Sequence, residues 1–225
     1  MPELPEVETV RRGLNKLTVK QPIQGGEVLL TRTLAYPADI EKFWQGMTGV
    51  GIKQWQRRGK YLLAQLENDS GKPAGWLGVH LRMTGQLLWV KQYYPLQKHT
   101  RIRLLFDGNQ ELRFVDTRTF GKFWLVPPQI ERESIITGLQ KLGPEPFDAD
   151  FSLDYFTQKL NNRRRHIKTL FLDQAIVAGI GNIYADEALF KSGIKPDTVA
   201  DNLTRKQIKR LHQSIIDVLQ TAIDK

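Results

Sequence analysis

Hydrophobic residues recur at helical spacing close to the start of the chain. Val7, Val10, Leu14 and Leu17 follow one another at steps of three and four residues, which places them on one face of an α-helix. A proline near the first turn presets the backbone angle φ, and glutamates there suit the helix dipole. The pattern therefore predicts a first helix with one buried face.

The chain that follows, up to about residue 126, has the pattern of β-structure. Short apolar segments are separated by turn residues, a spacing typical of an antiparallel sandwich or flattened barrel. Two segments alternate apolar and charged residues on either side of an Asp-Gly-Asn-Gln loop, so we expect their charged side chains on a solvent face. The predicted strands are 61–66, 76–80, 86–90, 101–106 and 111–115.

Beyond residue 150 the spacing becomes helical. Prolines at 127 and 128 and at 144 and 146 bound a segment that we interpret as a linker. The pattern predicts an α+β protein with an N-terminal β-sandwich domain headed by a helix (1–127), a linker (128–149) and a helical domain (150–225). The predicted helices are one capped by Asp150 or Ser152 and running through Leu160, then 167–172, 183–192, and a last one that begins near Thr204.

The composition indicates a binding partner with negative charge. The formal net charge is +9, and the excess of cations occurs in both predicted domains, which suits a polyanion such as DNA. A basic surface that only aids solubility is the alternative. The chain has no cysteine, and its four histidines lack metal-ligand spacing. No long apolar segment or signal peptide appears, so we expect a cytoplasmic protein with no membrane partner. We also expect a monomer, with no cofactor bound by these 225 residues.

The first residues carry candidate chemistry. Removal of Met1 would leave Pro2 as a free secondary amine, directly followed by the carboxyl group of Glu3. An α-amino group titrates far below a lysine side chain, and amines that attack carbonyl carbon form Schiff bases. A nucleophilic chain end with a neighbouring acid is therefore one hypothesis. The same residues at an ordinary helix start are the alternative.

A glycine-rich turn precedes one of the predicted helices. Gly179 and Gly181 lie immediately before Asn182, and N–H groups at such a helix start can bind phosphate oxygens. A cationic run at 161–168 lies shortly before this turn. The following pair of helices suits a grip on a DNA backbone. A plain helical hairpin with a solvated basic face stays an open alternative.

Two predicted loops place an apolar residue beside cations. Met83 follows Arg82, and Phe120 lies close to Arg118. Core packing is the common use of such apolar residues. The alternative is a wedge that enters a base stack while an arginine fills the vacated position. Lys60, at the start of a predicted strand, can be a surface cation or a site lysine.

Taken together, the motifs resemble those of bacterial formamidopyrimidine-DNA glycosylases, in the same order along essentially the whole chain. The N-terminal motif is specific, and Leu4 with the Val-Glu-Thr that follows favours this branch over the related endonuclease VIII branch. The matching segments are 1–9, 59–63, 80–85, 116–121, 142–146 and 179–187. The resemblance implies a β-sandwich lobe and a helical lobe with a helix–two-turns–helix motif, with DNA between them.

The resemblance also implies roles for individual residues. Pro2 would attack C1′ of the damaged nucleoside, Glu3 would donate a proton during base release, and Lys60 would donate a proton in β-elimination. The implied function is a bifunctional DNA glycosylase and abasic-site lyase of base-excision repair that removes oxidised purines, in a bacterial, nucleoid-associated setting. Residues that would fill the gap left by a flipped nucleotide are Met83, Arg118 and Phe120. Residues that would contact DNA are His99, Arg118, Arg163, Lys168 and Asn182.

The match has one gap. The family continues with a lid loop and a four-cysteine zinc hairpin, which these 225 residues do not contain. We therefore expect weakened DNA binding and poor lesion discrimination for the chain as given. Two alternatives stay open: a damaged-DNA binder without catalysis, and a glycosylase for oxidised pyrimidines. Nicking of an abasic-site duplex distinguishes an enzyme from a binder without catalysis. Comparison of thymine glycol with 8-oxoguanine as substrates distinguishes a pyrimidine from a purine glycosylase.

Overall fold

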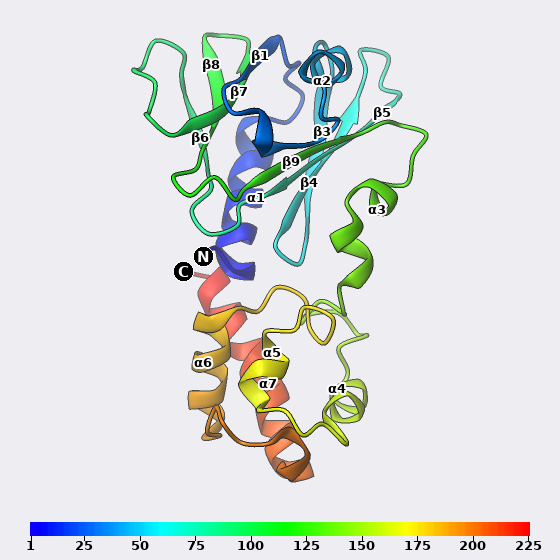
Figure 1. The fold of residues 1–225 in the computed structure, drawn as a ribbon, viewed down its shortest axis with the longest axis vertical. Helices are drawn as coiled ribbons and strands as arrows, with labels where there is room; N and C mark the ends of the chain where they lie inside the picture. The colour runs from blue at the N-terminus through cyan, green and yellow to red at the C-terminus, as the bar shows by residue number, and fades with distance from the viewer. The chain divides into compact units, whose positions relative to one another are not determined.

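The computed structural model describes all 225 residues and confirms the α+β class (Figure 1). The chain divides into two compact units, and residues close in sequence are split between them. The β-rich unit comprises Met1–Pro2, Val7–Arg57 and Tyr61–Thr137, and the helical unit comprises Glu3–Glu6, Arg58–Lys60 and Gly138–Lys225. The longest segment of the helical unit, Gly138–Lys225, starts within the segment predicted as a linker.

Nine strands form two sheets in the β-rich unit. One sheet has the order β1-β7-β8-β6 and the other β2-β9-β5-β4-β3. The pairs β1–β7, β7–β8, β6–β8, β4–β5 and β5–β9 are antiparallel, whereas β2 lies parallel to β9. The strands are β1 (Gly25–Val28), β2 (Leu34–Tyr36), β3 (Gly51–Arg58), β4 (Tyr61–Glu67), β5 (Pro73–His80), β6 (Gln86–Lys91), β7 (Thr100–Phe106), β8 (Gln110–Val115) and β9 (Lys122–Val126).

Four helical segments accompany the sheets. They are α1 (Leu4–Leu17), η1 (Thr31–Thr33), α2 (Ile40–Met47) and α3 (Arg132–Ile135). The five predicted strands are confirmed within a few residues, whereas β1, β2, β3, β9 and α2 were not predicted. The sequence pattern did not predict strand β3, because the strand lies at a sheet edge and most of its residues are polar or charged.

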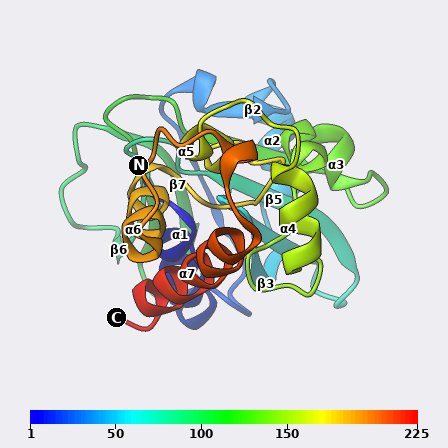
Figure 2. The same ribbon diagram turned by 90° about the horizontal axis from the view of Figure 1, so that it is seen from below.

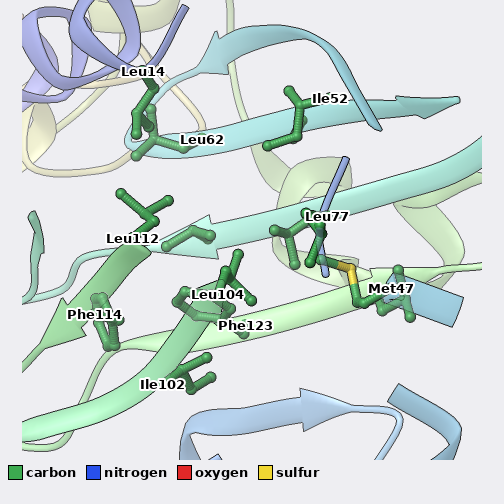
Figure 3. Close-up of a cluster of buried hydrophobic side chains, with 14 of the residues drawn as sticks. Leu14, Met47, Ile52, Leu62, Leu77, Ile102, Leu104, Leu112, Phe114 and Phe123 are labelled. Atoms are coloured by element: carbon green, nitrogen blue, oxygen red, sulfur yellow. The ribbon is translucent and has the colours of Figure 1, made fainter. Parts of the chain in front are cut away.

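The core of this unit lies between the two sheets (Figure 3). Leu62 and Leu77 of one sheet face Leu104 and Phe114 of the other, and Leu14 of α1 joins the cluster. All five side chains are buried, and burial of each contributes roughly 1.5–3 kcal/mol. The prediction for α1 is correct for Val7 and Leu14 but wrong for Leu17, which is 42% exposed because the helix ends there.

The solvent face predicted for β8 is also partly wrong. Glu111 and Arg113 are both fully buried and form an ion pair. Arg113 donates hydrogen bonds to the backbone oxygens of Tyr94 (2.7 Å) and Pro95 (2.8 Å). The alternating pattern failed here because the loop between β6 and β7 covers the charged face, and the arginine supplies that loop with donors.

Replacing Arg113 by methionine should therefore destabilise the protein. The Arg113→Met change removes the buried partner of Glu111 and the donors to the covering loop, so we expect a loss of about 3 kcal/mol in the free energy of unfolding. The matched control is Arg103→Met, because Arg103 also pairs with Glu111 but is partly exposed. The control should cost about 1 kcal/mol. Denaturant unfolding measures both, and equal losses would contradict this interpretation.

The helical unit forms a second core around its longest helix. Its elements are η2 (Thr137–Lys141), α4 (Leu153–Leu160), α5 (Ile167–Phe171), α6 (Asn182–Ser192), η3 (Ala200–Asn202) and α7 (Arg205–Ile223). Helices α6 and α7 lie side by side (Figures 1 and 2). Leu211 and Ile215 of α7 are buried against Phe156 and Leu189 in one cluster.

The predicted helix starts in this unit are close to those observed. Ser152 caps α4 by accepting the N–H of Tyr155, and Asp150 lies outside the helix. Thr204 caps α7 in a capping box with Gln207, which satisfies N–H groups left unpaired at a helix start. No helix in the structure has the length and apolar character needed to cross a membrane.

Candidate active site

The carboxylate of Glu3 is buried at the N-terminus of α6, and the residue is 2% exposed. One oxygen accepts the N–H groups of Gly181 (2.8 Å) and Tyr184 (3.2 Å), and the other accepts the N–H of Ile183 (2.8 Å). The positive end of the helix dipole favours an anion at this position. Glu3 is thus held in a fixed orientation by three backbone donors.

This arrangement corrects the interpretation of the glycine-rich turn. Three N–H groups that were expected to face phosphate are taken by the chain's own carboxylate. Both glycines are needed for that approach: a Cβ on Gly181 would lie 2.5 Å from Cδ of Glu3, and one on Gly179 would lie 2.7 Å from Cδ1 of Leu4. Gly179 also has a φ of +96°, which is accessible to glycine at little cost.

Glu6 and Tyr184 fix the same segment from a second side. One oxygen of Glu6 accepts the N–H of Glu3 (2.9 Å), and the other accepts the hydroxyl hydrogen of Tyr184 (2.6 Å). Burial raises the pKa of the Tyr184 hydroxyl, and the hydrogen bond to Glu6 and its negative charge raise it further. The tyrosine is therefore a neutral donor at physiological pH, and it ties α6 to the start of α1.

Lys60 is buried, with an exposed fraction of 7%, so the alternative of a surface cation is wrong. Burial lowers the pKa of its ammonium group below the ordinary value, while the nearby negative charges of Glu3 and Glu6 oppose that shift. Desolvation penalises the charged form of an amine, so a buried lysine gives up its proton more readily. Lys60 therefore suits proton transfer.

The turn that carries Lys60 is anchored to the segment 142–145. The Arg58 guanidinium donates to the backbone oxygens of Gly143 (2.7 Å) and Leu142 (3.2 Å) and to the carboxylate of Glu145 (3.2 Å). The N–H of Gly59 also donates to Glu145. Two motifs that are far apart in the sequence are thus joined by hydrogen bonds, and Lys60 is the residue directly after Gly59.

The pKa of Lys60 gives a testable pH dependence of stability. Its folded-state pKa is lowered, so between that value and the ordinary 10.5 the unfolded chain binds more protons and stability rises with pH. The difference in the free energy of unfolding between wild type and Lys60→Met should rise in favour of wild type once the pH exceeds the folded-state pKa of Lys60. It should level off above about pH 10.5. Denaturant unfolding over a pH series measures this, with Lys98→Met, at an exposed lysine, as the control. A difference that does not vary with pH would contradict it.

In the β-rich unit, Pro2 and Met83 line the same hollow. Its volume is about 400 Å³, and the strand ends and loops around it supply the other walls. Met83 is exposed, as is Phe120, so the interpretation of these two residues as core packing is wrong. The remaining lining residues are Thr84, Gly85, Gln86, Val115 and Thr117.

A buried aspartate organises the loops around this hollow. Asp116 accepts the hydroxyl hydrogen of Thr84 with one oxygen and the N–H of Gly121 (2.8 Å) with the other. The N–H of Arg118 in turn donates to the Thr84 hydroxyl (3.1 Å). Thr119 has a φ of +59°, an unusual conformation for a β-branched residue. One carboxylate therefore fixes the loop after β8 and the loop after β5 together.

Arg118, in the loop after β8, is exposed, and His99, before β7, is half-buried. The guanidinium of Arg118 lies over the ring of Phe120, 5.2 Å from its centroid. Nδ1 of His99 lies 3.1 Å from Arg101, and the backbone oxygen of His99 accepts the N–H of Asp116. The structure thus connects three of the predicted DNA-contacting or gap-filling residues to one network around Asp116.

The other predicted DNA contacts lie in the helical unit. Asn182 is exposed in the first turn of α6, and its N–H is not among those taken by Glu3. Lys168 on α5 forms an ion pair with Asp186 on α6 (2.8 Å). Arg163 is exposed in the connection between α4 and α5. Lys168 and Asn182 are thus linked through α6, whereas Arg163 belongs to a different segment of the unit.

Comparison with known proteins gives the family. Residues 1–123 match the formamidopyrimidine-DNA glycosylase N-terminal domain, and residues 142–225 match the H2TH domain of the same enzymes. The chain belongs to the formamidopyrimidine-DNA glycosylase family. Relatives of that name from Rippkaea orientalis and Nostoc sp. are 64% and 60% identical over 225 residues, which is 100% of this chain and 80% of each relative.

Solved structures of the family agree with the fold. The chain is similar to Lactococcus lactis Fpg bound to DNA that contains an abasic site, with a TM-score of 0.89 and 37% identity over 99% of this chain and 78% of that one. The same protein bound to DNA that contains N7-benzyl-Fapy-dG gives the same score and identity, over 99% of this chain and 79% of that one. Membership makes this chain an enzyme of the DNA glycosylase class with the N-terminal and H2TH domains predicted from its motifs.

The zinc ion implied by the family has no ligands in this chain. It has no cysteine, and no group of three or more His, Asp or Glu side chains could hold a metal ion. These 225 residues therefore do not fit a zinc site, and no part of the chemistry below involves one.

Sequence reasoning missed several residues that build the site. Asp116, Glu6 and Tyr184 each lie within a motif that was recognised, but their partners are distant in sequence and gave no signal. Gln174 lies outside every motif. A polar residue that precedes a glycine-rich turn by five positions is the only sign that could have marked it.

Proposed function

We propose that this chain is a bifunctional DNA glycosylase and abasic-site lyase that removes oxidised purines from duplex DNA. The observation that carries the proposal is the fixed carboxylate of Glu3, held by three N–H groups of α6, immediately after Pro2 in the sequence. The names of the relatives and the damaged DNA in the related complexes support the substrate class.

Base release would use Pro2 and Glu3. With Met1 removed, the lone pair of the Pro2 nitrogen forms a bond to C1′ of the damaged nucleoside as the bond from C1′ to the base breaks. Glu3 would receive the proton that the Pro2 nitrogen loses on forming this bond and pass it to the departing base, which takes the bonding electrons. The nitrogen lone pair then opens the sugar ring by breaking the C1′–O4′ bond, O4′ takes a proton from water, and an iminium ion is left between Pro2 and C1′.

Strand scission would follow by β-elimination. The iminium ion acidifies C2′, water takes the proton from that carbon, and the C3′–O bond breaks with its electrons going to the departing phosphate, which is the group that would be protonated. Lys60 would donate a proton in this step, which its buried position and lowered pKa favour. Hydrolysis of the imine then frees Pro2 for another turnover.

DNA binding would use the exposed residues of both units. A damaged base must leave the stack, at a cost of a few kcal/mol, and Met83, Arg118 and Phe120 would occupy the gap. His99, Arg163, Lys168 and Asn182 would contact the backbone. The net charge of +9 supplies affinity that falls with salt and does not depend on sequence.

Incision assays on three duplexes test the proposal. We expect base release and nicking with 8-oxoguanine opposite cytosine, nicking alone with a preformed abasic site, and slower release of thymine glycol. If none of the duplexes is nicked, the proposed enzymatic activity is wrong and a damage-binding protein without catalysis is favoured. Faster release of thymine glycol than of 8-oxoguanine would overturn the purine specificity, a distinction worth testing because Lactococcus lactis Fpg has a solved complex with DNA that contains an oxidised pyrimidine.

A further inference from the structure

The side chain of Gln174, which is partly exposed, contacts the glycine-rich turn within the helical unit. Its Oε1 accepts the N–H of Gly179 (2.9 Å), and its Nε2 donates to the backbone oxygen of Ile180 (2.8 Å). A primary amide is the side chain that supplies an acceptor and a donor in this geometry. The amide thus contacts two successive residues of the turn, and the next residue, Gly181, donates to Glu3.

The backbone of Gln174 reaches a second part of the site. Its backbone oxygen accepts the N–H of Gly143 (2.8 Å), and the oxygen of Gly143 accepts a hydrogen bond from Arg58, two residues before Lys60. The joint is tight, since a Cβ on Gly143 would lie 2.4 Å from the backbone oxygen of Ala175. Gln174 therefore touches both the turn that receives Glu3 and the segment that anchors the Lys60 turn.

We infer that Gln174 is a positioning residue for base release, acting through the turn 179–181 on the carboxylate of Glu3. The inference rests on the proposed function, because it assigns Gln174 a part in the step given to Glu3. Glu3 depends on donors from the turn and from α6, so a shift of the turn moves the proton donor relative to the substrate. Misplacement of a reacting group by about 1 Å can reduce a rate by roughly 100-fold.

The side chain and the backbone of Gln174 contact different parts of the site, so a side-chain substitution should affect the two steps differently. Replacing the side chain removes its hydrogen bonds to Gly179 and Ile180 but leaves its backbone oxygen to accept from Gly143. The step assigned to Glu3 should therefore suffer more than the step assigned to Lys60. A purely structural role would instead lower both steps together, in proportion to the folded fraction.

The test compares Gln174→Met, which loses the three hydrogen bonds of the amide (to Gly179, to Ile180 and, at 3.3 Å, to Leu172), with Gln174→Glu, which keeps an acceptor for Gly179. Gln213→Met, at an exposed glutamine that contacts Asp217 on α7, is the matched control. Single-turnover release of 8-oxoguanine should fall about tenfold or more in Gln174→Met with the half-saturating enzyme concentration little changed, while nicking of a preformed abasic site falls less than threefold. Gln174→Glu should recover part of the loss, and Gln213→Met should resemble wild type.

A second readout does not require activity. Amide hydrogen exchange at Ile183 and Tyr184, whose N–H groups donate to Glu3, should be faster in Gln174→Met than in wild type. If wild type releases no base yet this exchange responds, the proposed function has failed while the positioning contact stands. Unchanged exchange with unchanged base release would overturn the inference. The inference would also be wrong if base release and nicking fell equally, in proportion to the folded fraction of Gln174→Met. If Gln174→Met does not fold, the same criterion applies to Gln174→Glu.

Discussion

Replacing Glu3 by glutamine is expected to lower release of 8-oxoguanine by roughly 10²–10⁴-fold, the range for loss of a positioned proton donor. An amide carries no proton that it can give to the departing base. It also offers one oxygen where the carboxylate offers two, so the NH₂ group would face an N–H group of the α6 N-terminus. Loss of such a cap destabilises a protein by about 1 kcal/mol, which leaves it folded at assay temperature.

Single-turnover kinetics measure this effect, with Glu41→Gln as the control. Glu41 is an exposed residue in the first turn of α2, so its replacement should leave base release unchanged. Glu3→Gln should reduce base release more than it reduces nicking of a preformed abasic site, because the latter reaction has no base to release. Base release by Glu3→Gln within a few-fold of wild type would show that another group donates the proton.

Replacing Gly181 by alanine should reproduce much of that loss without touching an ionisable group. The added Cβ would lie 2.5 Å from Cδ and 2.6 Å from Oε1 of Glu3, distances that force the carboxylate away from its N–H donors. We expect base release to fall about 100-fold or more. The displaced carboxylate also leaves N–H groups of α6 unpaired, so the free energy of unfolding should fall by about 1–3 kcal/mol.

Gly13→Ala is the control for this substitution. Gly13 lies within α1, and its added Cβ would meet nothing within 4 Å. Alanine in place of glycine inside a helix stabilises by roughly 0.5–1 kcal/mol, so Gly13→Ala should keep its activity and melt slightly higher. Full activity in Gly181→Ala would show that the position of Glu3 in this structure is not the one used in catalysis.

The elements with a regular pattern could be predicted from the sequence. Alternation and turn residues located the five strands from β4 to β8, and capping residues such as Ser152 and Thr204 located helix starts. Elements such as β1 and β3 were not predicted, because glycine and polar residues at a sheet edge carry no periodic apolar signal. The burial of Arg113 was missed for a related reason: nothing local shows that a distant loop covers it.

The candidate site could be predicted only as separate motifs. Pro2, Glu3 and Lys60 were selected from the residues and the family resemblance. The sequence did not show that Glu3 caps α6, because that contact joins residues almost 180 positions apart. The glycine-rich turn was assigned to phosphate for the same reason: an N–H group at a helix start binds any suitable anion, and only the fold shows that a carboxylate of the chain is already there.

The central claim is that Pro2, freed of Met1, is the nucleophile. Sodium borohydride reduces an iminium ion to a stable amine, so a reaction with 8-oxoguanine duplex should leave the chain covalently attached to DNA. Peptide mapping by mass spectrometry should then locate the adduct on an N-terminal peptide that begins at Pro2. An adduct on Lys60 or another lysine would contradict the claim, and so would normal strand scission by a chain that retains Met1.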